Sequence, residues 1–278
     1  MNELVYGGHL LSLGASGIVW SVILLNGSDG GFPIVVLAYL ISQLVYNIDH
    51  LKEEKIVSSQ GNAERTSYLE KTRKKQVFAL MIYVALFIAF GVLSPLPVFL
   101  LSSSIVLGGI LYTLKLKKMM KEIVGLKNIY ISFFWGVLSF LVPLYYFLNP
   151  LNPVFISISL FIFLRWIVNS TFFDLKDIES DKKINIKTLP VVFGFTKTIN
   201  YLHLFNIFSG LALILFVYFS VLPTYTIVLL FLWIYSMFYL ARAKYLTDKD
   251  LRSLSYIVVD GEYILWPFAI LIGKYLFE

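Results

Sequence analysis

Long apolar runs alternate with short polar segments along this chain, and the lengths of the apolar runs indicate the class of protein. Three stretches contain no Asp, Glu, Lys or Arg: 76–114, 128–164 and 198–241. A helix needs about 20 apolar residues to cross the hydrocarbon core of a bilayer, so each stretch is long enough for two crossings. The pattern therefore predicts pairs of membrane-spanning helices.

Turn-forming residues interrupt each apolar run near its middle. Proline lacks a backbone N–H and restricts the residue before it, so 94–97, 149–153 and 222–224 are predicted to be tight turns. The glycine-rich segment 26–31 divides the first apolar run in the same way. We therefore predict an all-α membrane protein, a single domain over 1–278 with about nine transmembrane helices. The predicted helices are 5–25, 32–48, 76–93, 97–115, 128–148, 154–173, 198–220, 224–241 and 254–275.

Composition supports the same class and excludes some kinds of site. Hydrophobic residues make up 58% of the chain and charged residues 14%, whereas soluble domains carry about 25% charged residues. The sequence has no cysteine, which excludes disulfides and thiolate metal sites.

The basic residues are distributed unevenly with respect to the predicted crossings. All Lys and Arg except Arg165 and Lys274 lie in four segments that nine crossings place on one side, together with the N-terminus: 49–75, 115–127, 174–197 and 242–252. The positive-inside rule makes this side cytoplasmic. We therefore predict an integral protein of the cell (inner) membrane with a cytoplasmic N-terminus and an external C-terminus. The net charge of +6 then reflects topology, and no nucleic-acid partner is predicted.

The sharper of two acidic clusters follows the sixth predicted helix. Asp174, Asp177 and Asp181 are spaced i, i+3, i+7, which places three carboxylates on one face if the helix continues. Such carboxylates repel one another unless a cation lies among them, and hard oxygen ligands suit Mg²⁺, which commonly bridges to phosphate. A solvated helix end balanced by lysines such as Lys176 would have the same spacing, and spacing alone leaves both interpretations open.

A second acidic cluster ends the second predicted helix. Asp49 and Glu53 are spaced i, i+4, and Asn47 lies beside them in the sequence. Both clusters follow the second helix of a predicted hairpin, so they lie on the same predicted side of the membrane. Two facing carboxylate groups at one depth can hold a Mg²⁺–diphosphate between them.

A diphosphate also requires cationic partners. Positive-inside topology accounts for most lysines of 115–127, but Lys127 stands at the mouth of the fifth predicted helix and is the strongest candidate. Arg65 is a further candidate on the same side.

Charges inside the membrane are costly and indicate function by default. Arg165 lies about two and a half helical turns before Asp174. It is a candidate for substrate binding, and an ion pair between Arg165 and Asp260 or Glu262 of the last helix explains it equally well.

The order of hairpins and the placement of these motifs resemble the UbiA-type intramembrane prenyltransferases over nearly the whole chain. The stretch 174–191, with its trailing Thr-Leu-Pro, looks like the second aspartate motif of that family, and 125–128 is similar to the segment entering its fifth helix. The resemblance implies nine helices around a central cavity and two aspartate motifs that bind Mg²⁺ and an isoprenyl diphosphate. The first motif departs from the family pattern Asn-Asp-x-x-Asp-x-x-x-Asp, because Val45 and Tyr46 stand where its first Asn and Asp would be.

These inferences together predict a Mg²⁺-dependent prenyltransferase that transfers a prenyl group from an isoprenyl diphosphate to an aromatic or other lipophilic acceptor in the bilayer. The predicted metal ligands are Asp49, Glu53, Asp174, Asp177 and Asp181, of which Asp49, Asp174 and Asp177 are also the predicted catalytic residues. The predicted substrate-binding residues are Asn47, Arg65, Lys127, Arg165 and Asn169.

Two alternative functions remain open from the sequence. A membrane terpene cyclase of the same fold would ionise the same diphosphate and let the prenyl chain attack itself. A transporter could use Arg165, Asp260 and Glu262 as a midplane site, but it would leave the paired acidic clusters unexplained.

Overall fold

The computed structural model describes residues 2–57, 63–116, 120–183 and 185–278. In this described part the chain is almost entirely helical and forms no β-strand. The longer helices are α2 (His9–Leu25), α3 (Phe32–Val57), α4 (Ala63–Val92), α5 (Leu96–Leu111), α7 (Leu126–Leu138), α9 (Pro153–Leu175), α12 (Phe195–Tyr218), α13 (Leu230–Ala243) and α15 (Asp260–Phe277). The shorter α-helices are α1 (Asn2–Tyr6), α8 (Leu141–Tyr145), α10 (Ile178–Lys183), α11 (Leu189–Phe193) and α14 (Asp248–Ser253). Two π-helical segments, η1 (Tyr112–Leu116) and η4 (Leu254–Val259), and two 3₁₀ segments, η2 (Met120–Glu122) and η3 (Thr224–Leu229), complete the helical structure.

The lengths of these helices confirm the predicted all-α membrane fold. Within the described residues, eight helical spans are long and apolar enough to cross a bilayer. A shorter apolar helix, α2, adds 17 residues. At 1.5 Å per residue it is roughly 25 Å long, slightly less than the hydrocarbon thickness. The predicted number of about nine crossings is therefore close to what the structure has.

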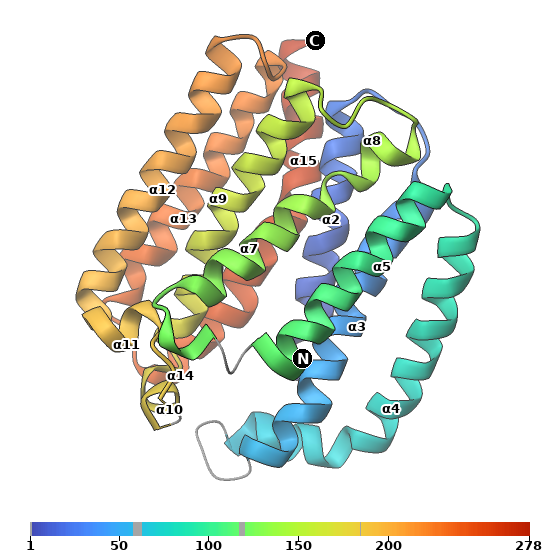
Figure 1. Ribbon diagram of the computed structural model, residues 1–278. Coiled ribbons are helices and arrows are strands. Elements are labelled where there is room, and N and C mark those ends of the chain that lie inside the picture. The colour runs from blue at the N-terminus through green and yellow to red at the C-terminus, as the bar shows by residue number, and fades with distance from the viewer. Residues whose placement is uncertain (1, 58–62, 117–119, 184) are drawn as a thin grey trace.

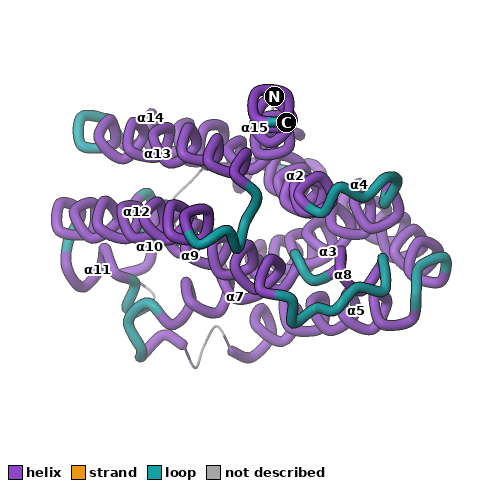
Figure 2. Tube along the Cα trace, turned by 90° about the horizontal axis from the view of Figure 1, so that it is seen from above, coloured by secondary structure: helices purple, strands orange, loops and turns teal. Residues whose placement is uncertain are grey.

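The helices pack in two groups that meet at α2 and α15 (Figure 2). One group is formed by α2, α3 and α5, and the other by α7, α9, α12 and α13. Tight packing of α15 on α2 joins the groups on one side, and contacts between α5 and α7 join them on the other. Outside this arrangement, α4 packs mainly on α3, and only 11% of its span is buried. Most of the surface of α4 is therefore available to lipid.

The polar segments gather at one end of the bundle. Figure 1 shows α10, α11 and α14 at its lower end, where α3 ends and α4 begins, whereas α8 and the C-terminus lie at the upper end. The segments described in the four basic regions thus share one end, which we call the charged end. Its assignment to the cytoplasm is still a prediction from charge bias.

The polar ends of two helices extend further than the apolar pattern predicts. The predicted helices 32–48 and 76–93 correspond to α3, which continues to Val57, and to α4, which already begins at Ala63. Glu and Lys are good helix formers, so the helices continue where the apolar residues stop. Hydropathy therefore located the membrane-embedded part of each helix but not its ends.

The predicted helix 128–148 is interrupted between α7 and α8. Pro143 has no N–H to donate to the carbonyl of Ser139, four residues earlier. That carbonyl accepts instead from the backbone N–H of Val142 at 3.3 Å, an i→i+3 bond that tightens the turn. Pro143 thus accounts for the break between α7 and α8, which the apolar pattern does not predict.

A glycine and a proline allow α2 and α15 to approach closely. Pro267 lies inside α15 and cannot donate to the carbonyl of Tyr263. A Cβ at Gly17 of α2 would lie 2.2 Å from that carbonyl oxygen, so only glycine permits this approach.

Candidate active site

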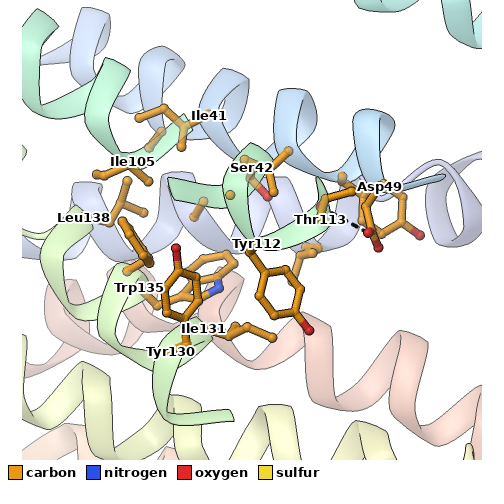
Figure 3. A pocket seen from close by; sticks show the side chains of 17 residues that line it. Ile41, Ser42, Asp49, Ile105, Tyr112, Thr113, Tyr130, Ile131, Trp135 and Leu138 are labelled. Atoms are coloured by element: carbon orange, nitrogen blue, oxygen red, sulfur yellow. Dashed lines mark hydrogen bonds between the residues drawn. The ribbon is translucent and has the colours of Figure 1, made fainter. Parts of the chain in front are cut away.

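A cavity of about 210 Å³ lies between α2, α3, α5, η1 and α7. Its wall is apolar and aromatic along most of its length, with Asp49 at one end and Ile105 and Leu138 at the other (Figure 3). Because α3 runs toward the charged end, Asp49 marks the polar mouth and the apolar residues lie deeper in the bundle.

Stacked aromatic rings form one wall of this cavity. Tyr112 of η1 stacks on Tyr130 of α7 with ring centroids 5.6 Å apart, and the Tyr130 hydroxyl donates to the carbonyl of Gly108 at 2.9 Å. Further along α7, Trp135 stacks on Trp166 of α9 with centroids 3.6 Å apart and an interplanar angle of 12°. These contacts fix a rigid, water-excluding surface between the two groups of helices.

The first acidic cluster is held by η1. The hydroxyl of Thr113 donates to Asp49 Oδ1 at 3.1 Å, and Lys52 Nζ donates to the backbone carbonyl of Thr113. Both Asp49 and Thr113 line the cavity. The Asp49 carboxylate is therefore presented at the cavity mouth by contacts from α3 and η1.

The second acidic cluster begins with Asp174 in the last turn of α9. Asp174 is 2% exposed, and Lys127 Nζ lies 2.7 Å from its Oδ1. The side-chain amide of Asn128 donates to its Oδ2 at 2.9 Å. Both oxygens of Asp174 thus contact residues at the start of α7.

The three acids of this cluster do not lie on one continuous helix, so that prediction is wrong. α9 ends at Leu175, where its apolar sequence stops, and α10 begins only at Ile178. Asp177 lies in the turn between them, its side chain is 45% exposed, and it pairs with Lys176 at 2.5 Å. Asp181 belongs to α10 and is buried, and its Oδ2 has no hydrogen-bond partner in the described structure.

Lys127 connects the second acidic cluster with the cavity wall. Gly125, with φ of 76°, allows the left-handed turn that starts α7 and brings Lys127 to Asp174. Its ammonium group also interacts electrostatically with Asp181, and Tyr112 of the cavity wall lies nearby. Lys127 therefore lies where the anionic end of a ligand in the cavity would meet the carboxylates.

Other predicted site residues lie elsewhere or outside the described part. The amide of Asn47 donates to the backbone carbonyl and the side-chain oxygen of Gln43, both at 2.8 Å, and Asn47 does not line the cavity. Asn169 donates to the backbone carbonyl of Val259 at 3.1 Å. The side chains of Glu53 and Arg65 lie outside the described residues, so their predicted roles are not tested.

Arg165 adopts the ion-pair arrangement that the sequence offered as an alternative to substrate binding. It is 1% exposed, its Nε donates to Glu262 Oε1 at 3.2 Å, and its Nη2 also contacts that carboxylate. Its remaining donors reach Asn206 and Ser236. The guanidinium is thus enclosed by α12, α13 and α15.

Comparison with known proteins identifies the family. A model of the UbiA prenyltransferase family matches residues 70–259, well over half of the chain. This chain belongs to the UbiA prenyltransferase family. None of the curated proteins matches it significantly.

Solved UbiA structures share the fold at low sequence identity. A UbiA homologue from Aeropyrum pernix K1 in its apo form matches with a TM-score of 0.71 and 12% identity, covering 95% of this chain and 97% of the homologue. A homologue from Archaeoglobus fulgidus bound to GPP and Mg²⁺ matches with a TM-score of 0.68 and 13% identity over 98% and 100% of the two chains. A digeranylgeranylglyceryl phosphate synthase matches with a TM-score of 0.60 and 14% identity over 98% and 99%. The UbiA fold thus extends over the whole chain.

The donor chemistry at the charged end fits the magnesium ion that was predicted for this UbiA chain. A buried carboxylate oxygen without a partner is costly, and Asp181 Oδ2 has no partner among the described residues. Carboxylate oxygens are the ligands that Mg²⁺ prefers. No three Asp, Glu, His or Cys side chains cluster within the part of the chain that is described.

Sequence reasoning missed several residues of the UbiA site. Asn128 was adjacent to a predicted residue but was not assigned its contact with Asp174. Ile131, Trp135 and Leu138 of α7 line the cavity at i, i+4, i+7, and this spacing could have indicated a common face. Thr113 carried no such signal, because its contact depends on how α3 and α5 pack.

Proposed function

We propose that this UbiA-family protein transfers a prenyl group from an isoprenyl diphosphate to a lipophilic acceptor in the membrane, with Mg²⁺ as cofactor. Two observations carry the proposal: an apolar aromatic cavity has Asp49 at one end, and Lys127 pairs with the buried Asp174 and interacts electrostatically with Asp181. A diphosphate with an apolar tail has the matching chemistry at both ends.

The anionic end of the substrate would lie among the acidic clusters and Lys127. Asp49, Asp174 and Asp181 would hold Mg²⁺, together with the predicted ligands Asp177 and Glu53. The bound metal supplies charge neutralisation to the departing diphosphate. Lys127, with a side chain 28% exposed, would donate to diphosphate oxygens and stabilise the same developing charge.

The cavity would hold the prenyl chain and protect its reactive end from water. Tyr112, Tyr130 and Trp135 present ring faces on which positive charge developing at an allylic carbon is favourable. The acceptor would approach from the Asp49 end of the cavity or from the bilayer. The acceptor is accordingly expected to be a membrane-soluble molecule.

A transferase and a terpene cyclase would use this cavity differently, and one experiment separates them. Purified protein is placed in vesicles of pure phosphatidylcholine or in vesicles of a total bacterial lipid extract. Each is incubated with Mg²⁺ and labelled isoprenyl diphosphates of 5 to 20 carbons (about one to four isoprene units), and products are analysed by mass spectrometry.

Prenylated lipid that forms only in the extract vesicles supports transfer. Cyclic or linear hydrocarbon products in phosphatidylcholine alone would support the cyclase instead. Consumption of no diphosphate in either vesicle would overturn the proposed function.

A further inference from the structure

Three successive contacts join α3 to α5 and η1 near the charged end, and each is of a different kind. At the first contact, a Cβ on Gly109 would lie 2.4 Å from Val45 Cγ2, so the two helices approach closely. One turn further on both helices, Thr113 Oγ1 donates to Asp49 Oδ1 at 3.1 Å. The third contact runs from Lys52 to the backbone carbonyl of Thr113. The close approach at Gly109 brings the Thr113 hydroxyl within reach of Asp49.

The backbone changes at this point in a way that suits a functional residue. Regular α-helix ends at Leu111, and η1 continues as a π-helical turn from Tyr112 to Leu116. Single π-helical turns are frequent at functional sites, since they re-aim side chains and loosen the regular backbone bonding. Here the turn directs Tyr112 and Thr113 to the cavity, and the Thr113 carbonyl accepts from Lys52.

One turn before Asp49 on α3 stand Val45 and Tyr46, and neither is an acid or an amide. The nearby amide of Asn47 is directed to Gln43. A carboxylate that is to bind a cation needs a neighbouring donor that fixes its orientation.

We propose that Thr113 is the positioning residue of Asp49, so that η1, which continues α5, orients this carboxylate. This inference rests on the proposed function, since it assigns Asp49 to binding of Mg²⁺ and diphosphate. Thr113 is 2% exposed, so bulk water does not compete with Asp49 for its hydroxyl group. A hydrogen bond to an ionised carboxylate is about twice as strong as one between neutral groups, and it fixes the plane of the carboxylate.

The test measures how much Mg²⁺ is needed for binding of the methylene diphosphonate analogue of geranyl diphosphate. The purified full chain is titrated calorimetrically with this analogue at increasing Mg²⁺ concentration. Thr113→Val keeps the shape and removes the donor, and it should raise the Mg²⁺ concentration for half-maximal binding about 10-fold or more. Thr113→Ser keeps the donor and should retain the parental requirement.

A matched control replaces another buried threonine far from the cavity. Thr226 is fully buried and donates to the carbonyl of Pro223 at 2.7 Å, so Thr226→Val loses a buried hydroxyl without touching Asp49. Thr226→Val should keep the parental Mg²⁺ requirement. Gly109→Ala gives a second route, since its Cβ separates α3 from α5, and it should shift the requirement in the same direction as Thr113→Val. Adding Val45→Ala should reverse that shift.

The outcomes separate this inference from the proposed function. Analogue binding in the parent with an unchanged Mg²⁺ requirement in both Thr113→Val and Gly109→Ala would overturn the positioning role alone. Equal losses in Thr113→Ser and Thr113→Val would also overturn it. A parent that binds no analogue at any Mg²⁺ concentration would overturn both proposals.

Discussion

The ion pair between Arg165 and Glu262 should be essential to stability. Arg165 is 1% exposed and Glu262 is fully buried. Tyr239 and Ser236 donate to Glu262 Oε2 at 3.4 and 3.3 Å, so both oxygens of this carboxylate are engaged. Removing either member leaves the other charged group buried without its counter-charge.

The magnitude follows from what the remaining group can do. Breaking a buried ion pair on one side costs about 3–5 kcal/mol of unfolding free energy. After Glu262→Gln the guanidinium cannot lose its proton, so the full cost is expected. Arg165→Met combined with Glu262→Gln should be less destabilised than Glu262→Gln alone, because no charge remains unpaired.

Thermal unfolding in detergent, followed by size-exclusion chromatography, measures these differences. At roughly 2–4 °C per kcal/mol, Glu262→Gln should lower the melting midpoint by roughly 6–20 °C. A matched control is Glu122→Gln, which removes an exposed pair with Lys187 at 2.7 Å; that pair lowers the pKa of the Glu122 carboxyl through its hydrogen bond. The control should melt like the parent. A Glu262→Gln midpoint equal to the control, or a double variant no more stable than Glu262→Gln, would refute this reasoning.

Four further predictions concern binding, metal dependence and topology. Lys127→Met should weaken binding of the geranyl diphosphonate at saturating Mg²⁺ by about 10-fold or more, since a charged hydrogen bond is lost; parental affinity in a calorimetric titration would contradict this. Asp177→Ala, or EDTA added to the parent, should abolish most of that binding, and equal affinity in EDTA and Mg²⁺ would exclude a metal role. If Glu53 is a metal ligand, Glu53→Gln should lower turnover by orders of magnitude and Glu53→Asp should retain part of it, whereas parental turnover in Glu53→Gln would assign it to a surface salt bridge. Single cysteines at Ser59 and Glu278 should react with an impermeant thiol reagent on opposite sides of the membrane, and labelling of both from outside would refute the orientation.

The membrane fold was predictable because charge and hydropathy act over whole helices. Uncharged stretches long enough for two membrane crossings located the helices, and the basic segments located the charged end. Hydropathy does not report where a polar helix stops or where a backbone bond is lost. The ends of α3 and α4 and the break at Pro143 were missed for this reason.

The candidate site was predicted for residues whose chemistry is visible in the sequence itself. Asp174 and Lys127 were both selected from their positions at helix ends, and the structure brings them together. The spacing of the three acids was misleading, because it assumed that α9 continues past Leu175. Thr113 could not be predicted from the sequence, because its role depends on the carboxylate that helix packing places opposite it.

Mg²⁺-dependent release of diphosphate from an isoprenyl diphosphate is the most direct test of the proposed prenyl transfer. The protein is assayed in vesicles of total bacterial lipid with geranyl diphosphate, and inorganic diphosphate is quantified in Mg²⁺ and in EDTA, with Asp174→Asn as the matched variant. The proposed function predicts release by the parent in Mg²⁺ only, together with a prenylated lipid, and a loss of at least about 100-fold in Asp174→Asn. Release of diphosphate that is unaffected by EDTA and by Asp174→Asn would contradict it.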